Sequence, residues 1–204
     1  MTQQLGILGG TFNPVHLGHL ILAQDALEHF HLDRVLFIPS AQPPHKRTEN
    51  LAPAAHRLAM LRAAVAGDPR FEVSSIELER QGPSFTIETI KALRAARPDA
   101  RLHFIIGTDS LLELHQWRSI EELLGLCEFV TMLRPGFPVE HLEEEQLHVP
   151  PPWGAHLLAN LFPGHTAEIS STDIRQRVAA GRSIRYLVPE AVAGYIAREG
   201  LYPA

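Results

Sequence analysis

The eleven residues from position 9 to position 19 constrain the fold of this chain more than any other stretch. They read GGTFNPVHLGH and stand between a short apolar run, residues 5–8, and an amphipathic segment, residues 20–30. This order predicts a buried strand, a glycine-rich turn that lets a ligand approach the backbone closely, and a helix. The first N–H groups of a helix have no partner within the helix and carry a partial positive charge. The stretch therefore predicts an anion site above the end of the first strand.

Two histidines of this stretch, His16 and His19, are three residues apart, so we expect both on one face of the first helical turn. Gly18 between them adds no bulk, which lets a phosphate group come close. Neither a G-x-x-x-x-G-K-[ST] phosphate loop nor a G-x-G-x-x-G dinucleotide motif follows the first strand. The alternative is a glycine turn whose histidines only cap or pack. Two imidazoles behind two glycines favour a phosphate cradle.

Apolar runs alternate with helical patterns along the rest of the chain. We expect strands at residues 34–39, 71–78, 101–107 and 128–133, and helices at 53–66, 84–97 with Ser84 as N-cap, 119–126, 171–180 and 189–198. Such alternation predicts an α/β fold: a doubly wound, mainly parallel, Rossmann-like sheet with a small C-terminal helical portion. Residues 138–164 hold acidic and proline clusters, and we expect a surface excursion there with a short strand near 156–161.

In an open parallel sheet, ligands bind at the carboxyl ends of the strands. The histidine stretch, the loop after residue 39, the Gly107-Thr108-Asp109 segment and Arg134 all follow predicted strands. We expect these four segments to converge on one edge of the sheet. Later in the chain, the hydroxyls of residues 170–172 make a natural helix start, and Arg175 falls in the first turn of that helix.

The composition sets the class of protein. The chain has 204 residues, 45% of them hydrophobic and 20% charged, so we expect one globular domain spanning residues 1–204. The net charge of −5 argues against nucleic-acid and membrane-surface binding. Cys127 is the only cysteine, which excludes an intrachain disulfide. The sequence contains neither a secretory signal nor an apolar run of spanning length, and we expect a cytoplasmic protein. The twelve histidines contain no His-Glu-x-x-His pattern and predict no protein-built metal site.

In combination, these motifs resemble the nucleotidyltransferase superfamily with the H-x-G-H signature. The histidine stretch and the late Ser-Ser-Thr-Asp-Ile-Arg segment carry that resemblance. Further segments, in their order and spacing, narrow it to the bacterial nicotinate-nucleotide adenylyltransferases: PPHK at 43–46, GPSFT at 82–86, FIIGTD at 104–109, Trp117, RPG at 134–136 and GLY at 200–202. The resemblance covers nearly the whole chain.

The resemblance implies a reaction in which ATP and nicotinate mononucleotide form the deamido form of NAD and pyrophosphate. The attacking phosphate is already an anion, so the chemistry needs alignment and charge neutralisation rather than a general base. The implied catalytic residues are His16 and His19, which donate to triphosphate oxygens, Lys46, which reaches the mononucleotide phosphate, and Arg175, whose planar fork fits phosphate. Among these, His19 is expected at the α-phosphate. Mg²⁺ would be held mainly through the ATP phosphates and water.

The resemblance also implies two sets of binding residues. The ATP-binding set is Gly9, Gly10, Thr11, Phe12, Gly107, Asp109, Ser170, Ser171 and Thr172. The nicotinate-nucleotide set is Thr86, Trp117, Arg118 and Arg134. An indole face attracts the positively charged pyridine ring, which gives Trp117 its expected role. Backbone N–H groups near Thr86 and Arg118 would meet the nicotinate carboxylate.

Several of these residues have a purely structural alternative. Trp117 would be core, Lys46 a solvated loop residue, Asp109 a helix cap, Arg134 a backbone contributor and Arg175 half of a surface ion pair. Two departures from the family pattern, Asn13 for Asp and Phe85 for Tyr, leave a hydrogen-bond role and fine selectivity open. For the whole chain, the alternatives are the same chemistry on nicotinamide mononucleotide or phosphopantetheine, or a catalytically silent nucleotide-binding module. A homo-oligomer is also left open.

Overall fold

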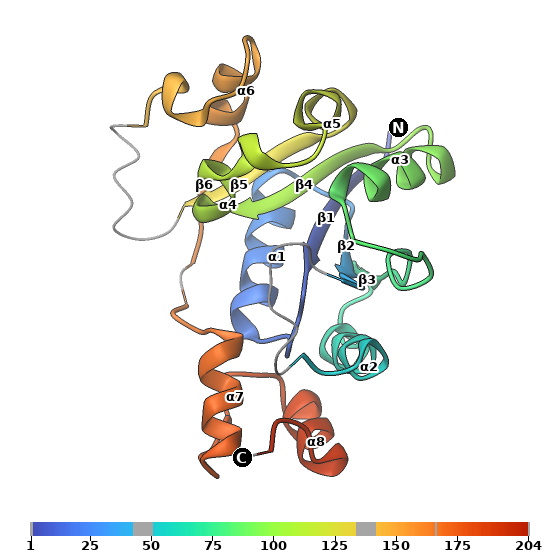
Figure 1. Ribbon diagram of the computed structural model, residues 1–204, viewed down its shortest axis with the longest axis vertical. Coiled ribbons are helices and arrows are strands. Elements are labelled where there is room, and N and C mark those ends of the chain that lie inside the picture. Colours follow the sequence, from blue (N-terminus) through green and yellow to red (C-terminus); the bar gives the residue numbers. More distant parts are fainter. Residues whose placement is uncertain (1, 43–50, 134–141, 166, 204) are drawn as a thin grey trace. The chain divides into compact units, whose positions relative to one another are not determined.

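The computed structural model describes residues 2–42, 51–133, 142–165 and 167–203 (Figure 1). Within these ranges it contains a six-stranded parallel sheet in the order β3-β2-β1-β4-β5-β6, with helices on both faces. The predicted Rossmann-like α/β fold is confirmed. The strands are β1 Gln4–Gly10, β2 Arg34–Pro39, β3 Phe71–Val73, β4 Arg101–Gly107, β5 Glu128–Leu133 and β6 Leu161–Pro163. The helices are α1 Leu17–His29, α2 Ala54–Val65, α3 Thr86–Ala96, α4 Thr108–Leu112, α5 Ile120–Leu126, α6 Trp153–Ala159, α7 Ser171–Ala179 and α8 Glu190–Glu199, with 3-10 turns η1 Leu114–Gln116 and η3 Glu144–Leu147.

The chain forms two compact units, and each is described by itself. Unit 1 comprises Met1–Leu8, Leu22–Val35 and Phe85–Thr166. Unit 2 comprises Gly9–Ile21, Leu36–Ser84 and Ala167–Ala204.

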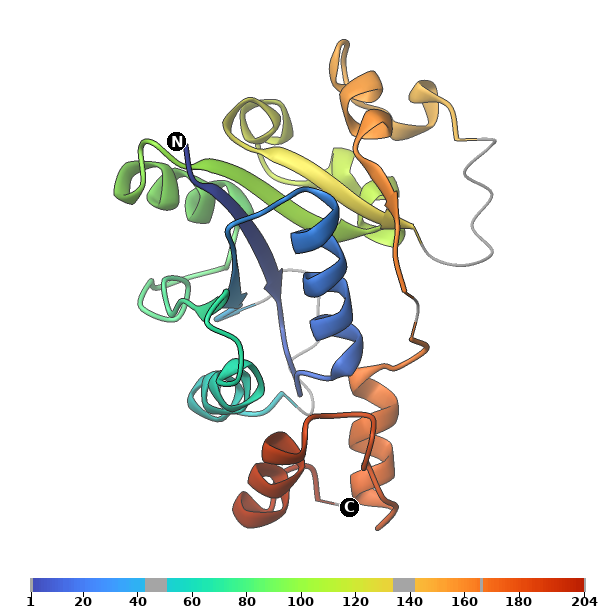
Figure 2. The ribbon, with the colours of Figure 1, turned by 180° about the vertical axis from the view of Figure 1, so that it is seen from behind.

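Unit 1 is built on the parallel strands β1, β4, β5 and β6. Their register places Leu5 beside Leu102, Phe104 beside Phe129, and Met132 beside Phe162. Figures 1 and 2 show α3 and α5 on one face of these strands and the second half of α1 on the other. Because both faces are covered, the strands are apolar almost throughout instead of alternating.

Three expected elements differ in the structure. The strand predicted at 71–78 ends at Val73. The strand predicted at 156–161 lies at Leu161–Pro163, and the preceding residues form the helix α6, which the proline-rich sequence did not indicate. Ser84 is not the N-cap of α3, because Phe85 occupies that position and the Ser84 hydroxyl accepts the N–H of Ala41 at 2.9 Å.

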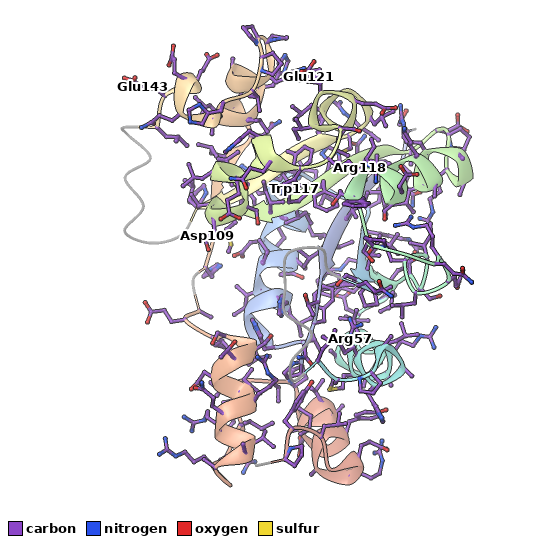
Figure 3. All side chains as sticks on the ribbon, in the orientation of Figure 1. Arg57, Asp109, Trp117, Arg118, Glu121 and Glu143 are labelled. Carbon is purple, nitrogen blue, oxygen red and sulfur yellow. The ribbon has the colours of Figure 1, made fainter. Side chains whose placement is uncertain are left out.

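Unit 2 packs α2 against α8 and β3. The side chain of Arg57, on α2, is only 1% exposed (Figure 3). Its guanidinium donates to the backbone carbonyls of Ala52 at 3.0 Å, Thr11 at 2.8 Å and Ser40 at 2.7 Å. Burial lowers the pKa of Arg57 from its ordinary value. One side chain thereby joins the turn after β1, the loop after β2 and the segment before α2.

Replacing Arg57 with Met should lower the free energy of unfolding by about 2 to 4 kcal/mol, because buried carbonyls lose a charged donor. Urea denaturation measures this loss. The matched control is Arg62→Met on the exposed side of the same helix, which should change stability by no more than about 0.5 kcal/mol. Equal losses in the two variants would contradict the role given to Arg57.

Candidate active site

The turn that follows β1 lies in unit 2 and differs from the sequence prediction. Gly9 and Gly10 are the last residues of β1, and the sharp change of direction falls at Phe12, whose φ is 48°. Gly10 instead makes room for the ring of Phe12, since a Cβ on Gly10 would lie 3.2 Å from that ring. The Phe12 ring is buried and packs edge-on against His19, with ring centroids 5.0 Å apart. The aromatic ring therefore supports a histidine of the motif.

His16 and His19 lie against each other, although not both within the helix as expected. Helix α1 begins at Leu17, so His16 directly precedes it and His19 lies in its first turn. Their ring centroids are 3.7 Å apart, and the backbone N–H of His16 donates to Nδ1 of His19 at 3.2 Å. Because Nδ1 of His19 accepts this bond, the proton of the neutral imidazole is on Nε2. His19 therefore has the tautomer whose Nε2 donates a hydrogen bond.

The imidazole of His16 is buried, with 8% of the residue exposed. Its Nδ1 has no hydrogen-bond partner within the described residues. Burial lowers the pKa of His16 to about 4. A Cβ on Gly18 would lie 3.1 Å from Nδ1 of His16, so the missing side chain leaves space for this ring. At neutral pH, His16 is therefore an uncharged imidazole in a closely fitted position.

The start of α7 is joined to the same turn of unit 2. The helix starts at the predicted cluster of hydroxyls: Ser170 is the N-cap, and its hydroxyl oxygen accepts the N–H of Asp173 at 3.1 Å. The Ser171 hydroxyl donates to the carbonyl of Pro14 at 2.9 Å. Arg175 donates through Nη1 to the carbonyl of Asn13 at 2.9 Å. A second guanidinium nitrogen, Nη2, donates to the hydroxyl oxygen of Thr172 at 3.4 Å. Residues some 160 positions apart in the sequence are thus adjacent.

Unit 1 carries two of the ATP-binding candidates and three of the nicotinate-nucleotide candidates. Gly107 ends β4 and is the N-cap of α4, so the alternative in which Asp109 caps this helix is wrong. Asp109 lies in the first turn of α4 and is exposed. Thr86 is the first residue of α3, whose N-cap, Phe85, makes no side-chain capping bond. The Arg118 guanidinium lies 4.6 Å from the centre of the Phe85 ring.

The indole of Trp117 is half-buried in unit 1. It packs edge-on against Phe104, at 5.8 Å between ring centroids, and against Phe129, at 6.0 Å. Figure 3 shows Trp117 and its neighbour Arg118 beside β4, with Asp109 further along the strand. Trp117 therefore packs on two core phenylalanines and is still half-buried rather than fully buried, so the structural and the ligand-binding explanations of this residue are compatible.

Two candidates, Lys46 and Arg134, lie outside the described residues.

The described ranges contain no group of three or more His, Cys, Asp or Glu side chains that could hold a metal ion. None of the helices in these ranges is long and apolar enough to cross a membrane. Sequence reasoning gave no site role to two residues in contact with the histidine stretch: Arg57 belongs to none of the motifs, and Tyr202 was noted only as part of the GLY segment at 200–202.

Comparison with known proteins decides the family. Residues 7–177 match the Cytidylyltransferase-like family model. The chain is 44% identical over 199 residues to the probable nicotinate-nucleotide adenylyltransferase of Symbiobacterium thermophilum, covering 98% of this chain and 95% of that protein. It belongs to the nicotinate-nucleotide adenylyltransferase family. The probable nicotinate-nucleotide adenylyltransferase of Geobacillus thermodenitrificans is 45% identical over 201 residues, covering 98% of this chain and 87% of that relative.

Solved structures support the fold of this nicotinate-nucleotide adenylyltransferase family member. The Plasmodium falciparum nicotinic acid mononucleotide adenylyltransferase complexed with NaAD has a TM-score of 0.76 at 16% identity, over 98% of this chain and 97% of that one. A putative nicotinate-nucleotide adenylyltransferase from Vibrio parahaemolyticus has a TM-score of 0.69 at 22% identity, over 98% and 95% of the two chains. At these identities the likeness concerns the fold alone.

The low pKa of His16 makes stability depend on pH. The unfolded chain binds a proton at His16 near pH 6.5, whereas the folded chain does so only near pH 4. The free energy of unfolding therefore falls as the pH falls through this window, by up to about 3 kcal/mol. In His16→Gln, the decrease between pH 7 and pH 4.5, measured by urea denaturation, should be smaller by about 2 to 3 kcal/mol. His103, whose pKa burial also lowers, is present in both proteins, so the comparison isolates His16. An identical pH dependence would show that folding does not perturb His16.

Proposed function

We propose that the chain transfers the adenylyl group of ATP to nicotinate mononucleotide, forming the deamido form of NAD and releasing pyrophosphate. The observation that carries the proposal is the identity of 44% over nearly the full length with a probable nicotinate-nucleotide adenylyltransferase. In this reaction, a phosphate oxygen of the mononucleotide bonds to the α-phosphorus of ATP. The bond from that phosphorus to the bridging oxygen breaks, and pyrophosphate leaves with the electron pair.

In this proposal, residues of unit 2 bind the phosphate groups of ATP and neutralise their charge. His19 donates from Nε2 to an oxygen of the α-phosphate, in the tautomer that its bond from the His16 N–H favours. His16 donates to a neighbouring phosphate oxygen, and the approach of this anion raises the pKa of its imidazole. Arg175 and the first N–H groups of α7 neutralise the charge that develops on the leaving group. Ser170, Ser171 and Thr172 place hydroxyls at the same helix start.

Further residues bind the triphosphate and the nucleoside of ATP. Gly9, Gly10 and the backbone of Thr11 line the triphosphate, and Phe12 contributes through its backbone because its ring is buried. In unit 1, Gly107 leaves space for the nucleotide, and the exposed carboxylate of Asp109 accepts from ribose or adenine.

The acceptor nucleotide is bound by the aromatic and amide groups of unit 1. Trp117 offers an indole face to the cationic pyridine ring. The nicotinate carboxylate accepts from backbone N–H groups near Thr86, where α3 starts without a side-chain cap, and near Arg118. We assign Lys46 to the mononucleotide phosphate and Arg134 to the pyridine-nucleotide side on the family pattern.

Nucleotidyltransferases of this kind typically use a divalent metal ion. We propose Mg²⁺, held mainly by ATP phosphate oxygens and water, because Mg²⁺ keeps several waters and binds substrate phosphates. The donor set fits this mode, since the described residues supply no carboxylate cluster that would form a cage. When bound, the ion neutralises negative charge on the phosphates. We further propose a cytoplasmic location and, on the family pattern, small-molecule substrates.

The net charge of −5 supports the proposal that nucleic acids and membranes are not partners.

Mass spectrometry of the products tests the proposed reaction. Purified protein is incubated with ATP and Mg²⁺ and, in separate reactions, with nicotinate mononucleotide, nicotinamide mononucleotide or phosphopantetheine. We expect the deamido dinucleotide and pyrophosphate to form fastest with the nicotinate substrate. Faster turnover of another acceptor would replace the proposed substrate. Tight ATP binding with no product from any acceptor would favour the catalytically silent module.

Replacing His19 with Ala should lower kcat by about 10²- to 10³-fold, the scale for losing one donor to the transition state. The fold should remain intact, because the side chain of His19 is only half-buried. Steady-state pyrophosphate release measures kcat, and circular dichroism checks the fold. His156→Ala, on the exposed side of α6, is the matched control and should retain full turnover. Full turnover in His19→Ala would remove this residue from the mechanism.

A further inference from the structure

The hydroxyl of Tyr202, near the C-terminal end of the sequence, contacts the turn that carries the motif histidines. We propose that Tyr202 is a positioning residue for adenylyl transfer: by bonding to Asn13, it fixes the peptide that holds Arg175 in place. This inference rests on the proposed function and on the role given there to Arg175.

The side chain of Asn13 joins two distant segments of unit 2. Its Oδ1 accepts the Tyr202 hydroxyl at 2.9 Å and the backbone N–H of Ala52 at 3.0 Å. A carboxamide oxygen has two lone pairs, so these two bonds use its full capacity as an acceptor. Asn13 is 6% exposed and Tyr202 is 9% exposed, so water does not readily replace either bond.

The backbone of the same turn holds the start of α7. The Asn13 carbonyl accepts Nη1 of Arg175 at 2.9 Å, and the Pro14 carbonyl accepts the Ser171 hydroxyl at 2.9 Å. The bonds of the Asn13 side chain hold the backbone of this residue, so losing the Tyr202 bond would let the Asn13 carbonyl that accepts Arg175 shift. Tyr202 and Arg175 are thus both bonded to Asn13, the former to its side chain and the latter to its backbone carbonyl.

The partners of Arg175 leave its charge available. In the part of the chain that the structure describes, the guanidinium donates to a carbonyl and to the Thr172 hydroxyl, both uncharged. A carboxylate at position 13 would place a negative charge beside it, whereas Asn13 accepts the same two side-chain bonds without charge. The two acceptor bonds that Oδ1 of Asn13 makes are ones that a carboxylate oxygen could also accept.

The backbone of Tyr202 also indicates that its position is enforced. Its φ is 61°, in the left-handed region that a bulky residue rarely adopts. Burial of the ring and the bond to Asn13 accompany this conformation. Strain of this kind persists only where the surroundings determine it, and it is common where a side chain is held for function.

The test compares two tyrosines of unit 2 that each lose one hydroxyl. Tyr202→Phe removes the bond to Asn13, and Tyr195→Phe removes the bond between Tyr195 and Nδ1 of His56, 3.0 Å long, which joins α8 to α2. We expect Tyr202→Phe to lower kcat about 5- to 20-fold at saturating substrates, whereas Tyr195→Phe keeps the wild-type kcat. Melting temperatures should fall by similar amounts in the two variants. If kcat is equally affected, or unaffected, in both, Tyr202 has no positioning role.

A double variant shows whether Tyr202 acts through Arg175. In an Arg175→Ala background, adding Tyr202→Phe should change single-turnover product formation less than twofold, because residues acting as a unit are not additive. A full additional 5- to 20-fold loss would overturn the inference. Wild-type turnover in Arg175→Ala would overturn the role of Arg175 itself. An impaired Arg175→Ala with an unimpaired Tyr202→Phe would reject this inference and leave the proposed function standing.

Discussion

The described part of unit 2 depends on guanidinium groups that are bonded to backbone carbonyls. Arg57 is buried and donates to Ala52, Thr11 and Ser40, and Arg175 donates to Asn13. Burying a cation is costly unless hydrogen bonds compensate for lost hydration. Carbonyl groups supply those bonds but do not cancel the charge. Within the residues that the structure describes, both guanidinium groups are therefore hydrogen-bonded to uncharged groups.

The two imidazoles fit this electrostatic arrangement. His16 is neutral at physiological pH because burial lowers its pKa to about 4, so it adds a hydrogen-bond donor without adding a buried charge. The His19 ring is held by a hydrogen bond from the backbone N–H of His16 and by an edge contact with the buried ring of Phe12. Its orientation is set before any ligand arrives. Preorganised donors of this kind stabilise a transition state without reorganising when charge develops.

Features repeated over several residues were predictable from the sequence, and isolated contacts were not. The apolar runs predicted the strands of the parallel sheet, and the hydroxyl cluster at residues 170–172 correctly predicted a helix start there. The burial of Arg57 was not predictable, because an arginine in an amphipathic helix is usually exposed. Nor was the bond from Tyr202 to Asn13, which links residues 189 positions apart and follows only from the tertiary fold.

The histidine motif was located correctly but its local geometry was not. The glycine pair favoured a turn at Gly9 and Gly10, whereas parallel pairing extends β1 through both and moves the turn to Phe12. His16 was expected inside the helix, yet α1 starts one residue later. Element ends depend on pairing and capping that a single sequence does not fix.

The glycine of the H-x-G-H signature serves its neighbouring histidine in a way that has a consequence for related chains. A Cβ at position 18 would lie 3.1 Å from Nδ1 of His16, whose ring is already within 3.7 Å of the His19 ring, centroid to centroid. A side chain at position 18 would therefore crowd the present position of the His16 ring. In a homologue with alanine at this position, the first imidazole would have to move by a few tenths of an ångström, so both histidines would remain in the sequence while the spacing of their rings changed.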